Sequence, residues 1–119
     1  MPDTSPAQHQ GHMLDKARTG LEELATGRFA ERMRNDMATR LMVAIGRVLL
    51  LRRAGLMGEA RPRPAQRRAV VEIERIAALW PHDEMTAAEF VGDLPPAEVR
   101  LLCELAPAWA AAMSAEIRR

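Results

Sequence analysis

Residues 28–53 read RFAERMRNDMATRLMVAIGRVLLLRR, and the rest of the chain is organised around this stretch. It contains the most apolar run of the sequence together with seven arginines. Within it an apolar residue recurs every three or four positions, at Phe29, Met33, Met37, Leu41, Ala44, Val48 and Leu51. This spacing is typical of one face of an amphipathic helix that packs on a core, so we predict one long helix over residues 28–53.

The second half of this predicted helix is apolar on its other faces as well. These faces carry Met42, Val43, Ile45, Leu49 and Leu50. A helix that is apolar all round is buried on several sides. The sequence therefore predicts that residues 28–53 form either the central helix of a bundle or part of a dimer interface.

Helical spacing also recurs on both sides of this stretch. It predicts helices over residues 13–26, 64–79 and 87–91, and a last helix that begins after Asp93 as its N-cap and reaches Ile117. Gly27, Pro81 and Gly92 are expected to end three of these helices, and Pro107 should kink or split the last one. We therefore predict an all-α fold, a bundle of four main helices plus one short helix, with the long second helix at its centre.

Two local patterns refine these boundaries. Thr86 and Glu89 have the spacing of a capping box, which indicates the start of the short helix. Residues 54–68, AGLMGEARPRPAQRR, contain two glycines and two prolines and form the one convincing linker. Within it Leu56 and Met57 are expected to fold back on the core, and Pro64 suits the first turn of the next helix.

The composition of the chain agrees with one small helical domain. Its 119 residues are 48% hydrophobic but only 3% aromatic, so aliphatic residues and methionine must build the core. Residues 1–12 are polar and are expected to form a flexible N-terminal arm, with a single helical domain over residues 13–119. Cys103 is the one cysteine, so no intramolecular disulfide is expected.

No membrane segment is expected from the sequence. The N-terminal residues have no apolar core of the kind that a signal peptide needs. The longest apolar run, Leu41 to Leu51, has eleven residues and is interrupted by Arg47, which is too short to span a bilayer. Together with the reduced cysteine this predicts a cytoplasmic protein without a membrane partner.

The charges are distributed unevenly although the net charge is only +1. Residues 28–68 contain eleven arginines and three acidic residues, whereas residues 69–119 contain four arginines and nine acidic residues. A basic middle next to an acidic end is more often neutralised within the fold than by an external partner. This interpretation is favoured over nucleic-acid binding.

The strongest functional signal is nevertheless the density of arginine. The candidate binding residues, which could contact phosphates, are Arg28, Arg32, Arg61, Arg63, Arg67 and Arg68. On the wheel of the central helix the arginines do not share one face, as those of a groove-binding helix would. Arg34 and Arg52 fall on one flank, while Arg40 and Arg47 fall at the edge of the apolar stripe. These two are expected to snorkel or to form ion pairs, with Asp15, Glu22, Glu23 or the acids of the last helix as possible partners.

Other chemistry has little support in the sequence. His9 and His12 have helical spacing but lack the further ligands of a zinc site, and the cluster of His82, Asp83 and Glu84 has no nearby partner. Arg61–Pro64 is too short to indicate a polyproline ligand. No nucleophile motif or phosphate-binding loop is present, so neither an enzyme, a metal nor a cofactor is predicted.

These observations predict a non-catalytic interaction or regulatory module that binds a protein partner through its helix faces. Homodimerisation through the apolar half of residues 28–53 stays open. The alternative is a nucleic-acid-associated accessory factor that uses the arginines for phosphate contacts. Binding to phosphates would weaken steeply with salt, whereas binding through apolar helix faces would not.

Overall fold

The computed structural model describes residues 6–26, 34–81 and 84–117, with the backbone alone for residues 6–10. Within these residues the chain forms five helices and no strand, which confirms the all-α fold. The helices are α1 (Pro6–Thr26), α2 (Arg34–Arg53), α3 (Pro64–Ala77), α4 (Ala87–Asp93) and α5 (Pro96–Ser114). Four are long and α4 is short, as the sequence predicts.

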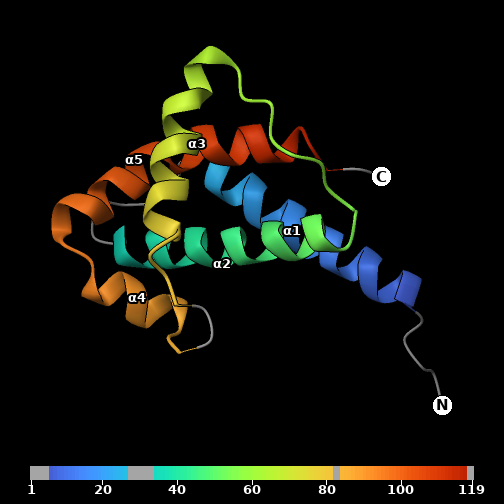
Figure 1. The fold of residues 1–119 in the computed structure, drawn as a ribbon, viewed down its shortest axis with the longest axis horizontal. Coiled ribbons are helices and arrows are strands. Elements are labelled where there is room, and N and C mark those ends of the chain that lie inside the picture. Colours follow the sequence, from blue (N-terminus) through green and yellow to red (C-terminus); the bar gives the residue numbers. More distant parts are fainter. Residues whose placement is uncertain (1–5, 27–33, 82–83, 118–119) are drawn as a thin grey trace.

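The centre of the bundle is shared by two helices (Figure 1). Helix α2 packs against α1, α4 and α5, while α5 packs against α1, α2 and α3. Helices α1 and α2 run in roughly opposite directions, and the first turns of α3 project beyond the rest of the bundle (Figure 1). The long second helix is thus a central element, but α5 is equally so.

The core is built from aliphatic residues, methionine and two aromatic side chains, Trp109 of α5, which is 2% exposed, and Phe90 of α4. On α2 the predicted stripe is buried throughout its described part, at Met37, Leu41, Ala44, Val48 and Leu51. Met42 and Ile45 on the neighbouring flank are buried too. Val43, Leu49 and Leu50 are not, since 38–51% of each remains exposed.

Several helix ends follow the expected local chemistry. Pro64 is the first residue of α3, and the preceding residue, Arg63, donates its backbone N–H to the side chain of Gln66 at 3.0 Å. Thr86 is the N-cap of α4, where its Oγ1 accepts the backbone N–H of Glu89 at 3.2 Å. Both contacts satisfy donors that the first turn of a helix leaves without partners.

Helix α2 ends at a left-handed glycine. Gly55 has φ of +73°, its N–H bonds to the carbonyl of Arg52, and the N–H of Leu56 bonds to the carbonyl of Leu51. This pair of bonds is a Schellman motif, which only glycine adopts without strain. The turn directs Leu56 and Met57 back onto the core, as predicted, and Met57 forms an isolated antiparallel bridge with Ile117 beyond α5.

Four boundary predictions were wrong. Helix α1 begins at Pro6 rather than Met13, because proline suits a first helical turn and only Gly11 weakens the segment that follows. Most of the arm predicted over residues 1–12 is therefore helical. Helix α4 continues through Gly92 to Asp93, so Asp93 does not cap α5 and Pro95 takes that position. Helix α5 ends at Ser114 rather than Ile117, and of the kink or split expected at Pro107 the split does not occur.

The predictions for residues 27–33 lie outside the described residues. They include Gly27 as a helix end, and Phe29 and Met33 as part of the stripe. Among the helices that are described, none combines the length and the hydropathy needed to cross a bilayer.

Candidate functional site

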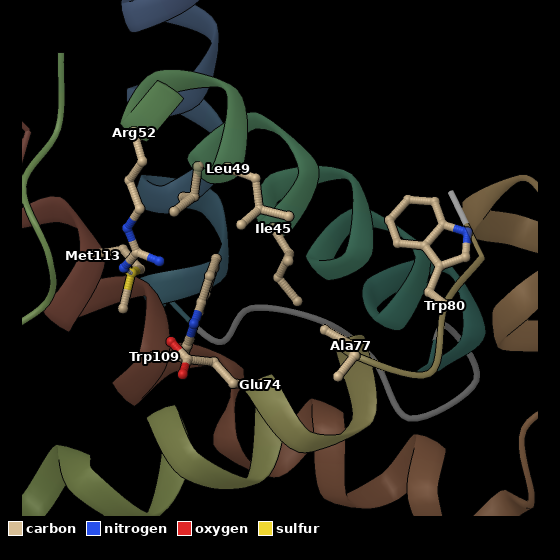
Figure 2. A pocket seen from close by; sticks show the side chains of 10 residues that line it. Ile45, Leu49, Arg52, Glu74, Ala77, Trp80, Trp109 and Met113 are labelled. Carbon is tan, nitrogen blue, oxygen red and sulfur yellow. Dashed lines mark hydrogen bonds between the residues drawn. The ribbon is translucent and has the colours of Figure 1, made fainter. Parts of the chain in front are cut away.

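Two hollows adjoin α2 on either side of Trp80. The first, here called the Arg52 pocket, has a volume of about 380 Å³ and lies between α2, α3 and α5 (Figure 2). Its walls are mostly apolar, and its charged side chains are Arg52 and Glu74. The lining residues are Ile45, Val48, Leu49, Arg52, Glu74, Ala77, Ala78, Trp80, Trp109 and Met113.

Arg52 is the cation of this pocket. At about 100° per residue it falls on the α2 wheel between Val48 and Ile45, both of which are buried. Its Nε is buried without a hydrogen-bond partner. Its Nη2 donates only to the Met113 sulfur, at 3.6 Å, and a thioether is a weak acceptor. The Arg52 side chain is therefore partly buried in the wall of the pocket, and no described carboxylate lies within ion-pairing distance of it.

The second hollow, here called the outer groove, lies on the exposed side of α2 and has a volume of about 700 Å³. Val43, Gly46 and Leu50 follow one another along its floor at helical spacing. Arg47 and Arg53 border this strip on opposite sides of the helix wheel. Leu49, Trp80 and Ala87 complete the lining, so Leu49 and Trp80 belong to both hollows.

Trp80 is fixed between the two hollows by specific contacts. Its indole Nε1–H donates to the carbonyl oxygen of Met85 at 2.8 Å. Its ring also stacks on Phe90 of α4, with the ring centroids 6.1 Å apart. The segment that follows α3 is thereby tied to α4, and the walls of both hollows depend on this tie.

The predicted arginine site is only partly described. Arg28 and Arg32 lie outside the described residues. Arg61, Arg63, Arg67 and Arg68 are exposed and follow one another through the linker and the first turns of α3. Among the described acids only Glu104 of α5 approaches one of these four, at 3.9 Å from Arg68. Neutralisation by the described acids of the last third is thus limited to one long, exposed contact. The four arginines lie in and before the first turns of α3, which is about 21 Å long, whereas Trp80 follows its other end.

The two arginines at the edge of the apolar stripe behave differently. Arg40 pairs at 3.0 Å with Glu23 of α1, which is one of the possible partners named from the sequence, and at 3.4 Å with Asp36, which is not. Arg47 extends over Gly20 of α1, and a Cβ at Gly20 would lie 3.3 Å from its guanidinium. Gly20 thus gives Arg47 room along the surface between α1 and α2.

Cys103 is partly buried on α5, and its thiol donates to the backbone carbonyl of Arg34 at 3.3 Å. Burial raises the pKa of the Cys103 thiol, while the positive charge of Arg34 and a hydrogen bond from the Ala38 backbone act in the opposite direction. Because burial is the larger effect, the neutral thiol is the favoured form. This environment suits an inert thiol rather than a nucleophile.

We expect Cys103 to react slowly with iodoacetamide at pH 8, roughly threefold to tenfold slower than in the denatured chain. The alkylation rate of the folded protein should rise with pH only above the ordinary thiol pKa, about 8.5, because the folded-state pKa is raised. The neutral thiol also contributes to stability. This contribution is present below the ordinary pKa and is lost as the pH rises through the raised pKa of the folded state. Mass spectrometry in buffer and in guanidinium checks the rates, and equal rates would contradict the environment described.

No catalytic cluster emerges from the described part of the chain. Within residues 11–26, 34–81 and 84–117, no three histidine, cysteine or acidic side chains gather where they could hold a metal ion. His82 and Asp83 lie outside the described residues, and Glu84 is exposed. What the described residues offer is a charged apolar pocket and an apolar groove, and both are suited to binding.

Comparison with known proteins adds no family to these observations. The chain matches no protein-family model, no curated protein and no solved structure.

Proposed function

We propose that this chain is a non-catalytic, cytoplasmic interaction module that binds a helix of a partner protein in the outer groove. The observation that carries the proposal is the strip of Val43, Gly46 and Leu50, which stays open on a helix whose other apolar residues are almost all buried. Contiguous apolar surface that the fold itself does not cover is typical of a binding site. A groove of this kind accepts the apolar face of an amphipathic helix.

Gly46 supports this proposal independently. Glycine inside a helix costs roughly 0.5–1 kcal/mol relative to alanine. Nothing inside the fold requires it, since a Cβ at Gly46 would meet no described atom within 4 Å. A glycine on an exposed face does allow another backbone to approach closely, and Gly46 lies in the middle of the strip.

The charges of the groove favour a particular partner. Arg47 and Arg53 border the strip on its two sides, and neither forms an ion pair with a described acidic residue. A partner helix with acidic residues flanking its apolar stripe complements them. A second copy of the chain in a two-fold pairing would instead bring like charges together, so a different protein is favoured over a homodimer.

The test compares two exposed apolar positions. Leu50→Glu places a charge in the outer groove, whereas Val71→Glu places one on α3, where Val71 is 63% exposed. A partner that co-purifies from the native cell with the wild type and with V71E, but not with L50E, supports the proposal. Equal loss with both variants, or retention with both, contradicts it.

Light scattering at tens of micromolar separates the two kinds of partner. The proposal expects a monomer. A dimer that L50E dissociates and V71E leaves intact would show that a second copy occupies the groove, which is the homodimer that the sequence left open.

Replacing Gly46 with alanine should separate stability from binding. We expect the free energy of unfolding to rise by about 0.5–1 kcal/mol, because the helix gains a better former at a site with room for the methyl group. Binding of the partner helix should weaken, since the methyl group holds the two backbones apart. Urea denaturation and co-purification measure the two effects, and a variant that gains stability and keeps full binding would show that Gly46 has no part in docking.

A second candidate function rests on a separate surface. Arg61, Arg63 and Arg67 are exposed at the start of α3, whose first turn contains no acidic residue, and none pairs with a described acid. Positive side chains at the positive end of a helix dipole favour an anionic partner such as nucleic acid. Binding of duplex DNA or RNA that falls steeply with salt, and is lost on joint reversal at Arg63→Glu and Arg67→Glu, would support this alternative.

A further inference from the structure

We infer that the Arg52 pocket binds a small organic monoanion, a carboxylate carried on an apolar body. This inference concerns a different surface from the proposed helix site and does not rest on it. The volume of about 380 Å³ lies at the lower end of the range of small-molecule sites. Like those sites, the pocket is mostly apolar and has few polar groups.

The state of Arg52 is the first argument. A buried donor without a partner destabilises a fold unless something outside the fold satisfies it. The Arg52 Nε is such a donor, and the Met113 sulfur at 3.6 Å is a poor substitute for an oxygen acceptor. An apolar residue at this wheel position would pack between Val48 and Ile45 without that cost, so packing alone does not account for an arginine here.

The chemistry of the ligand follows from the groups around this cation. A guanidinium presents its N–H donors in planar pairs that match the two oxygens of a carboxylate. Figure 2 shows the Arg52 side chain descending from α2 toward Met113, with Trp109 below it. A carboxylate on Arg52 would therefore place the attached apolar body among Trp109, Ile45 and Ala77.

Glu74 limits the charge of the ligand. It lies on α3 and lines the same pocket, it is exposed, and it does not come within ion-pairing distance of Arg52. A second negative charge on the ligand would be repelled by this carboxylate. The pocket thus offers one positive and one negative side chain, which favours a monoanion over a phosphate or a dicarboxylate.

The experiment uses 4-phenylbutyrate as the probe and its neutral amide, 4-phenylbutyramide, as the matched comparison. Binding to the full chain is measured by calorimetry and by saturation-transfer NMR. We expect saturable binding of the acid, with the amide weaker by roughly tenfold or more, because the charge-assisted pair is lost. Equal affinities, or no saturable binding of the acid at millimolar concentration, would overturn the inference.

Variants locate the site. Arg52→Met should weaken binding of the acid by roughly tenfold or more, and Arg52→Lys should have a smaller effect because the charge remains without the fork. Arg100→Met, at an exposed position on α5 outside both hollows, should leave the affinity within roughly twofold, as expected for a surface charge. If the Arg52 and Arg100 variants behave alike, the effect is one of general charge and the pocket is not the site.

Two further measurements test whether a loss of binding comes from unfolding and whether Glu74 repels the ligand. Arg52→Met should melt at the same temperature as the wild type or higher, since it removes an unpaired buried donor. A loss of binding in a stable variant then cannot come from unfolding.

Glu74→Gln should tighten binding of the acid by roughly twofold to threefold, because it removes a repelling charge. Weaker binding of the acid would show that Glu74 pairs with Arg52 or with the ligand, and would contradict the monoanion assignment.

Discussion

Replacing Leu41 with alanine is expected to lower the free energy of unfolding by about 3–5 kcal/mol. Leu41 is fully buried, and it belongs to the helix that packs against α1, α4 and α5. With neighbours on several sides, the structure has little freedom to close the cavity that the substitution leaves. Because small domains are stable by only about 5–15 kcal/mol, the variant would lose a large part of its stability.

Urea denaturation followed by far-UV circular dichroism measures this loss. The matched control is Leu50→Ala, the same substitution on the same helix at a side chain that is 51% exposed. The control should change stability by no more than about 0.5 kcal/mol. Similar losses in both variants would mean that α2 does not present these faces to the core and to the solvent.

Replacing Ala110 with aspartate is expected to cost about 3–5 kcal/mol at neutral pH, the penalty of an uncompensated buried charge. Ala110 is fully buried on α5, and the described core contains no buried polar or charged residue that could pair with the new carboxylate. The variant should therefore be largely unfolded. Thermal unfolding at several pH values measures the effect.

The pH dependence of this variant has a definite sign. Burial favours the neutral carboxyl and so raises its pKa in the folded state above the ordinary value, about 3.9. The difference in stability from the wild type should therefore be smallest near pH 4 and should grow as the pH rises. Ala111→Asp, at the exposed neighbour on the same helix, should cost no more than about 1 kcal/mol, mainly from the nearby helix C-terminus. An equal cost at both positions would contradict the placement of α5.

Several features of the fold that depend on local chemistry were predicted correctly. The start of α3 at Pro64 and the cap at Thr86 rest on single residues whose roles hardly depend on the rest of the chain. The return of Leu56 and Met57 to the core follows from a glycine that ends α2 and two apolar residues directly after it.

Two of the errors arose where tertiary packing overrides a local rule. Gly92 disfavours a helix interior by about 1 kcal/mol and Pro107 by about 3 kcal/mol or more, and burial of the surrounding helix offsets such a cost. Phe90 and Val91 precede Gly92, and Ala106 and Trp109 flank Pro107, and all four are buried. A rule that considers one residue at a time does not include this compensation.

The Arg52 pocket shows a second limit of sequence reasoning. A narrow apolar stripe on the wheel of residues 28–53 puts Arg52 on a flank. Helix α2 in fact buries a wider arc, because Ile45 and Met42 also face neighbouring helices, and Arg52 lies inside that arc. The spacing of Arg52 from Val48 and Ile45 could have indicated its place in the pocket, but this interpretation depends on how many helices surround α2. The dense run of arginines favoured the linker as the predicted site instead.

Trp80 has a consequence for how the two hollows would respond to ligands. The same indole ring forms part of the Arg52 pocket and of the outer groove, and its bond to Met85 and its stacking on Phe90 restrict how far it can move. A molecule that shifts Trp80 from one side changes the wall of the other. Occupancy of the pocket and occupancy of the groove are then thermodynamically linked, and by reciprocity each would change the affinity of the other by the same factor.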